Sequence, residues 1–191
     1  MSLLERMPPR RRREGLTDYR QRLRLVKSSL PRLVVRRTNR YLIVQVIKPR
    51  MGGDETILTI TSKKLRDFGW KAGLKNTPAA YLTGLLAGLL VKDKIEKAVL
   101  DIGLQRPSKG AKVFAAAMGF RDAGVEIPLG EEKLPDEDRV KGKHIAEYYE
   151  MLKSSETPII QFSKMDESIY MNLEAHFEEV KNRILKELGG K

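Results

Sequence analysis

Few residues of this 191-residue chain have the types and spacing that catalysis requires. It contains no cysteine and only two histidines, His144 and His176, which lie far apart in charged segments with a helical pattern. Without cysteine there is no thiol nucleophile, thiolate metal site or disulfide framework. The G-x-S-x-G pattern of serine hydrolases and the G-x-x-x-x-G-K-[ST] phosphate loop are also missing. These observations argue against most enzyme classes.

One acidic residue, Asp101, is placed like a metal ligand. It ends the apolar run VLD, and an acid at the end of a strand resembles the first metal-binding carboxylate of ribonuclease-H-like and actin-like enzymes. Metal-assisted phosphoryl transfer needs further carboxylates that converge on the ion. The candidates Asp54, Asp67, Asp122 and Asp136 lie in turns or on polar helix faces without a matching motif. A metal-dependent nuclease of ribonuclease-H-like type centred on Asp101 is therefore the alternative hypothesis, and we expect no metal or cofactor.

The segment RPSKGAKV, residues 106–113, is suited to bind a phosphate. It lies between a predicted strand and a predicted helix, where backbone amides together with Lys109 and Lys112 can hold an anion at a helix N-terminus. A single glycine makes this a weak nucleotide-binding signal. We interpret the segment as a contact for one phosphate of an RNA backbone.

Positive charge is concentrated near the N-terminus. The chain has a formal net charge of +12, and residues 1–40 hold 13 basic residues against 3 acidic ones, an excess of ten. The rest of the sequence is close to neutral, so the pattern predicts a polyanionic partner for one segment of the protein. Arginine pairs with phosphates in two-pronged geometry and stacks on unpaired bases, so dense arginine interleaved with Tyr19 and Tyr41 favours structured RNA.

The sequence indicates an α/β fold in three parts. Residues 1–31 form a basic arm, in which Arg10–Arg13 should be extended or disordered without a counter-charge, because like charges repel. Thr17 or Asp18 then caps a short helix whose apolar positions are Tyr19, Leu23 and Val26.

Residues 32–128 form the predicted core domain. The runs at 32–38, 40–47 and 55–61 predict an antiparallel three-strand meander with turns at Asn39 and at Gly52-Gly53. A helix from Thr77, a short strand over 97–103 and a helix over 111–123 add a parallel crossover strand. Gly84 and Gly88 lie on one face of the first helix, which predicts close packing against another backbone.

Residues 129–191 form the predicted helical C-terminal extension. Residues 130–143 are polar and irregular, and a helix with one apolar side begins near His144. Ser163 and Asp166 form a capping box for one long final helix, whose apolar stripe runs from Met165 to Leu188. This stripe leaves a third hypothesis open, a protein-interaction adaptor.

Three segments together resemble a known family: RRRREGLTDYRQRL, RLVVRRTNRYLIVQVI and FGWKAGLKNTPAAYLTGLLAGLL. They are similar to the archaeal type of the large-subunit ribosomal protein eighteen family, whose eukaryotic relatives are ribosomal protein five. VLDIGLQRPSKGAKVFAAAMGFRDAGVEIP and DEDRVKGKHIAEYY extend the resemblance to about Tyr149. Leu16 stands where a lysine is common, which removes one expected phosphate contact.

The resemblance implies a structural constituent of the large ribosomal subunit and no enzyme. The family binds 5S rRNA and mediates its attachment to the 23S-type large-subunit rRNA in the central protuberance, beside neighbouring ribosomal proteins. Combined with the basic pattern, it predicts these RNA-binding residues: Arg10, Arg11, Arg12, Arg13, Tyr19, Arg20, Arg22, Arg24, Lys27, Arg32, Arg36, Arg37, Asn39, Arg40, Lys109 and Lys112.

We expect a cytoplasmic location on the ribosome, with no membrane or DNA partner. The longest apolar run, residues 79–91, is shorter than the roughly 20 residues that cross a bilayer. No secretory leader is expected either, because residues 1–13 turn basic where an apolar run would begin.

Overall fold

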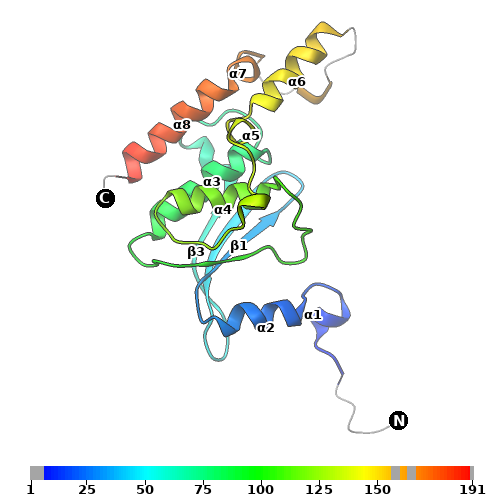
Figure 1. Ribbon diagram of the computed structural model, residues 1–191, viewed down its shortest axis with the longest axis vertical. Coiled ribbons are helices and arrows are strands. Elements are labelled where there is room, and N and C mark those ends of the chain that lie inside the picture. Colours follow the sequence, from blue (N-terminus) through cyan, green and yellow to red (C-terminus); the bar gives the residue numbers. More distant parts are fainter. Residues whose placement is uncertain (1–6, 156–159, 163–166, 190–191) are drawn as a thin grey trace.

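The computed structural model describes residues 7–155, 160–162 and 167–189, and the chain within them forms a mixed sheet packed with helices (Figure 1). The helices are α1 (Arg10–Arg13), α2 (Tyr19–Lys27), α3 (Thr77–Val91), α4 (Lys112–Asp122), α5 (Glu137–Lys141), α6 (Lys143–Ser154), α7 (Glu167–Met171) and α8 (Leu173–Leu188). The strands are β1 (Arg32–Arg37), β2 (Leu42–Lys48), β3 (Glu55–Thr61) and β4 (Val99–Asp101). Short 3₁₀ turns are η1 (Ser62–Arg66), η2 (Glu131–Lys133) and η3 (Ile160–Phe162).

The four strands lie in the order β3-β2-β1-β4. The first three pair antiparallel, and β4 runs parallel to β1 with Arg32 opposite Val99, so the predicted meander and crossover are confirmed. The observed β4 is shorter than the predicted 97–103. Lys97 makes only an isolated bridge to Glu126, and the chain turns at Gly103, where φ is +60°.

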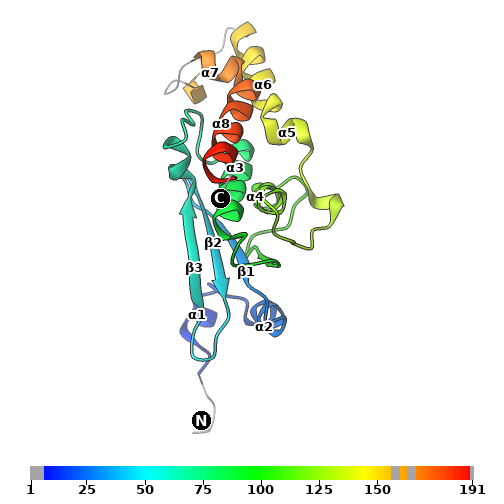
Figure 2. The ribbon, with the colours of Figure 1, turned by 90° about the vertical axis from the view of Figure 1, so that its left-hand side faces the viewer.

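Helices α3 and α4 cover one face of the sheet and approach each other closely (Figure 2). A Cβ at Gly84 would overlap the carbonyl oxygen of Ala116, and a Cβ at Gly119 would overlap that of Tyr81. The predicted close packing of the α3 glycines is therefore confirmed. The cap of α3 is Asn76, whose Oδ1 accepts a hydrogen bond of 2.9 Å from the Ala79 amide.

The C-terminal region is helical, and two predictions for it were wrong. Residues 130–143 are not wholly irregular, because α5 forms there and buries Val140 in the core. The long final helix is interrupted at Asn172, where α7 ends and α8 begins. Tyr170 of α7 packs edge-on against Phe162 with ring centroids 4.5 Å apart, and the backbone of Asn172 leaves helical geometry at φ −113° and ψ 36°. The predicted Ser163–Asp166 capping box and Met165 lie outside the described residues.

Helix α8 packs on the core of the same chain. Its apolar stripe is buried among the residues that cover the sheet: Leu173, Phe177, Val180 and Ile184. His176, next to Phe177 on α8, stacks on Trp70 with ring centroids 5.1 Å apart. It also accepts a 3.1 Å hydrogen bond from the Lys71 amide. Burial lowers the pKa of His176, against the opposing effect of Glu179.

We expect Gly84→Ala to destabilise the fold. The added Cβ meets the backbone of α4 rather than a flexible side chain, so overpacking should cost about 1–3 kcal/mol or more despite the better helix propensity of alanine. Gly53→Ala is the control, because nothing lies within 4 Å of its Cβ. Urea unfolding measures both variants. Equal stability of Gly84→Ala and the wild type would contradict the close approach.

We also expect acid to loosen the docking of α8. Because the folded pKa of His176 lies below its unfolded value of about 6.5, its contribution is complete above that pH and is lost as the pH falls. Fluorescence of Trp70, the single tryptophan, reports the contact directly. His176→Gln keeps an acceptor for Lys71 and should remove this acid sensitivity, whereas His144→Gln should leave the Trp70 signal sensitive.

Candidate nucleic-acid interface

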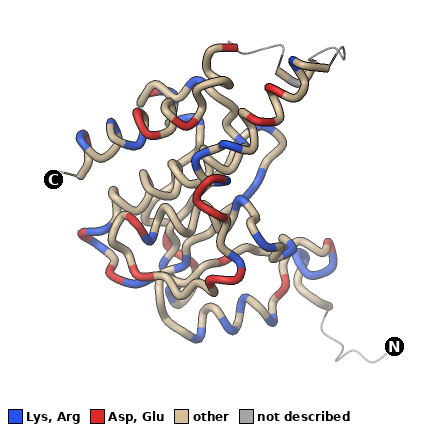
Figure 3. The backbone as a smooth tube through the Cα atoms, turned by 45° about the horizontal axis from the view of Figure 1, so that its top comes forward, with Lys and Arg blue, Asp and Glu red and all other residues tan. Residues whose placement is uncertain are grey.

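The predicted RNA-binding residues fall into two groups at opposite ends of β1. The arm lies beside Arg32, and the β1–β2 hairpin follows Arg37. Five residue steps of extended strand separate these ends by roughly 17 Å. Basic positions recur along the segment next to the N-terminus (Figure 3). The sheet therefore holds two basic surfaces at a fixed spacing.

The arginine run is helical, so the prediction of an extended or disordered segment was wrong. The Pro9 carbonyl accepts hydrogen bonds from the Arg12 and Arg13 amides, which closes a single turn. Local acceptors offset part of the repulsion: Arg11 Nε donates to Thr17 Oγ1 at 2.8 Å, and Arg10 lies 3.5 Å from Glu14. All four arginines stay exposed, which leaves them open to a phosphate backbone.

The side of α2 that lies beside the sheet differs from the apolar side predicted from the sequence. Asp18 caps the helix through the Arg20 and Gln21 amides, as predicted. Leu23 is 62% exposed, however, and Leu25 lies in the groove beside the sheet instead. No residue of α1 or α2 is buried, so the arm is not held by an apolar core.

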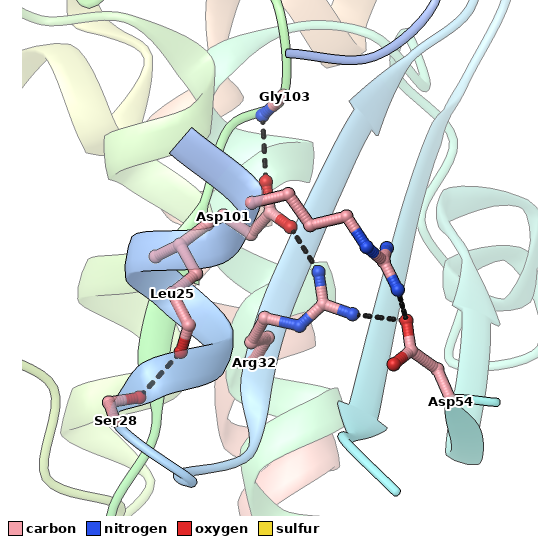
Figure 4. A network of polar contacts seen from close by, with 7 residues as sticks. Leu25, Ser28, Arg32, Asp54, Asp101 and Gly103 are labelled. Carbon is pink, nitrogen blue, oxygen red and sulfur yellow. Dashed lines mark hydrogen bonds and ion pairs between the residues drawn. The ribbon is translucent and has the colours of Figure 1, made fainter. Parts of the chain in front are cut away.

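An ion-pair network around Arg32 holds the arm to the sheet (Figure 4). Arg32 Nη1 donates to Asp101 Oδ2 at 2.8 Å, and Arg32 Nη2 donates to Asp54 Oδ2 at 2.5 Å. Arg22 of α2 donates to the same Asp54 oxygen at 2.6 Å, while Asp101 Oδ1 accepts from the Gly103 amide at 2.9 Å. The network thus joins α2, β1, β4 and the β2–β3 loop.

Arg32, predicted to contact RNA, has a side chain only 3% exposed and is enclosed by two carboxylates. Buried ion pairs contribute little net stability but are costly to break, which suits them to fix geometry. Asp101 is likewise engaged by Arg32 and Gly103 rather than facing other carboxylates. Among the described residues, no group of three His, Cys, Asp or Glu is placed to hold a metal ion.

Side-chain hydrogen bonds hold the turn at the other end of β1. The Thr38 hydroxyl donates to the Tyr41 carbonyl at 2.7 Å and accepts from the Tyr41 amide at 3.0 Å. Gln105 accepts from Arg37 Nε and donates to the Val35 carbonyl, both at 2.7 Å. Arg36, Asn39 and Arg40 are exposed. The backbone thus holds these polar residues at fixed spacing.

Beside the hairpin is a cleft of about 940 Å³, which was not predicted from the sequence. The predicted residues Arg40 and Lys112 line the cleft. Lys109 is exposed on the loop before α4 and does not line it. Sequence reasoning missed three further cations of the lining: Lys63, Arg66 and Lys75. The cluster of basic residues in SKKLRDFGWKAGLK was the available signal.

Comparison with known proteins identifies the family. The family model for ribosomal large subunit proteins 60S L5 and 50S L18 matches residues 6–98 and 91–130. Large ribosomal subunit protein uL18 of Methanothermobacter thermautotrophicus is 50% identical, covering 94% of each chain. The uL18 protein of Staphylothermus marinus is 48% identical over 95% of this chain and 93% of its own.

The chain belongs to the uL18 family of large-subunit ribosomal proteins. Methanoregula boonei uL18 is 55% identical over 74% of this chain and 82% of its own. Members are structural proteins of the large ribosomal subunit rather than enzymes, which excludes the nuclease alternative for Asp101. In the described part of the chain, no helix is long and apolar enough to cross a membrane.

We expect Asp54→Asn to release the arm. Asp54 binds both Arg22 and Arg32, and without its charge α2 loses its main polar tether while Arg32 keeps Asp101. Trypsin should then cleave after Arg24 and Lys27 faster than in the wild type, with the core intact. Glu55→Gln is the matched control, since its pair with Arg50 is exposed at both ends. Unchanged cleavage in Asp54→Asn would show that the network does not hold the arm.

Proposed function

We propose that this protein binds 5S rRNA and mediates its attachment to the 23S-type rRNA of the large subunit in the central protuberance. Family membership gives the ribosomal setting. The observation that carries the proposal is the arm, which presents eight basic side chains and buries none of its helical residues. Such a segment gains most of its binding energy from an external polyanion.

The surface of the arm is suited to folded RNA. Its arginines can pair with phosphates in two-pronged geometry. Tyr19 and Leu23 are 37% and 62% exposed between the basic positions, where they can contact sugars and unpaired bases. Arg22 is 40% exposed, so it can bind a phosphate while still pairing with Asp54. The enclosed Arg32 helps to position the arm through Asp54, which also binds Arg22.

Two basic surfaces on one sheet suit a protein that joins RNA segments. The arm and the hairpin cannot change their separation without bending β1, which is buried on the side facing α3 and α4. Both surfaces can therefore contact 5S rRNA at once, which fixes the orientation in which it is attached to the large-subunit rRNA. The C-terminal helices lie at the far side from the arm (Figure 1) and expose Tyr148 and Met151. We assign this side to neighbouring ribosomal proteins.

Replacing Arg10–Arg13 with alanine should reduce the salt dependence of binding to 5S rRNA. Each lost phosphate contact lowers the slope of log affinity against log salt by about 0.7 to 0.9, so four substitutions should flatten it by roughly 3. Preference for 5S rRNA over an unrelated structured RNA should change much less. A salt titration with both RNAs measures the two effects.

The control variant replaces four cations of the C-terminal helices, Lys153, Lys181, Arg183 and Lys186, and should keep the wild-type slope. Alanines at Arg36, Arg37 and Arg40 should erode the preference for 5S rRNA, because the hairpin holds these residues at fixed spacing. A slope that is the same in the wild type and the arm variant would rule out phosphate contacts by the arginine run.

A further inference from the structure

The cleft beside the hairpin is formed where four segments of the chain converge. The hairpin contributes Arg40 and Tyr41, the turn after β3 contributes Lys63 and Arg66, and the start of α3 follows Lys75. Lys112, the first residue of α4, closes the lining. The N-termini of two helices thus lie at one cleft, and their dipoles add to its positive potential.

The positive charge of this cleft is not neutralised within the described chain. Five cations line it and no acid does: Arg40, Lys63, Arg66, Lys75 and Lys112. None of the five has an ion pair among the described residues. The groove beneath the arm is different, because Asp18, Asp54 and Asp101 line it together with its arginines. The cleft therefore offers an anion more unpaired positive charge than the groove beneath the arm does.

Lys112 shows how closely these cations are gathered. Burial lowers its pKa, and the nearby charges of Lys75, Arg37 and Arg139 lower it further. In this setting an anion stabilises the charged form of the ammonium group, because it replaces lost hydration and offsets like-charge repulsion. A phosphate is large enough to meet two of these side chains at once.

Tyr41 gives the cleft a planar apolar wall. The two hydrogen bonds to Thr38 fix its backbone, and its side chain is half-buried. Lys63 Nζ lies 4.6 Å from the centre of the ring, so a mobile side chain rather than the core covers that face. A nucleobase can replace the ammonium group there, since stacking on an aromatic ring tolerates any base. Asn76 uses its oxygen to cap α3 and contributes an amide NH₂ donor to the lining of the cleft.

We propose that this cleft binds one unpaired nucleotide of ribosomal RNA, with the base on Tyr41 and the phosphate between Lys75 and Lys112. The inference rests on the proposed function and adds the kind of RNA that the hairpin end recognises. A paired base is stacked within its helix and cannot reach the ring, whereas a looped-out base can. An acidic peptide would satisfy the cations but would leave the ring face without a planar partner.

Binding of the full chain to two fluorescent probes tests this inference: a ten-nucleotide single-stranded oligoadenylate and a fully paired RNA duplex with the same number of phosphates. Tyr41→Leu should weaken oligoadenylate binding roughly 5- to 100-fold, the range expected for loss of one stacked base. Tyr41→Phe should stay within about twofold of the wild type, since the ring remains. Binding of the duplex should be the same for all three proteins.

A Tyr41→Leu variant that binds oligoadenylate like the wild type, or loses duplex binding to the same extent, would overturn the proposal. A second measurement avoids substitution altogether: ultraviolet crosslinking of the wild type to an oligonucleotide with one 4-thiouridine. Crosslinks should map to the tryptic peptide 41–50, and crosslinks confined to other peptides would contradict the cleft.

The same proteins titrated with 5S rRNA separate the two proposals. If the wild type prefers 5S rRNA with the expected salt dependence but Tyr41→Leu changes neither probe, the cleft inference is wrong and the proposed function stands. If the wild type shows no preference for 5S rRNA but Tyr41→Leu still loses oligoadenylate, the cleft is supported and the proposed function is wrong.

Discussion

The arrangement of this molecule depends on the enclosed guanidinium group of Arg32. Its partners Asp54 and Asp101 come from the β2–β3 loop and from β4, so one side chain joins segments that are 22 and 69 residues away in sequence. A buried charge must keep its partners, because an uncompensated one costs several kcal/mol. The position of Asp54 in turn sets where Arg22 and helix α2 lie. The direction of the basic arm thus follows from the packing of the sheet.

The helical layer makes the sheet a rigid spacer. Backbones of α3 and α4 meet at Gly84 and Gly119, and α8 adds a second layer through Phe177 and Ile184. Neither the arm nor the turn at residues 38–41 contributes to this core, so both can differ in sequence without changing the distance between them. A ribosomal protein that must hold two RNA segments in register gains from such a division between scaffold and contact surface.

The sequence predicted what depends on local pattern and missed what depends on distant partners. Alternation and turn residues located β1 to β4, and the glycines of α3 predicted its close packing. The helical turn at Arg10–Arg13 was missed because Thr17 and Glu14 offset its repulsion. The enclosure of Arg32 by Asp54 and Asp101 was not predicted, because no local signal shows it. The break at Asn172 and the basic cleft likewise arise from tertiary packing.

Hydrogen exchange of the backbone amides, measured with and without 5S rRNA, tests the central claim that one sheet carries two RNA-binding surfaces. In the free protein, the amides of α2 should exchange much faster than those of β1, since the arm buries no residue. Addition of 5S rRNA should slow exchange in residues 10–27 and 36–41 and leave α8 unchanged. Protection confined to residues 143–189, with residues 10–41 unaffected, would contradict the account.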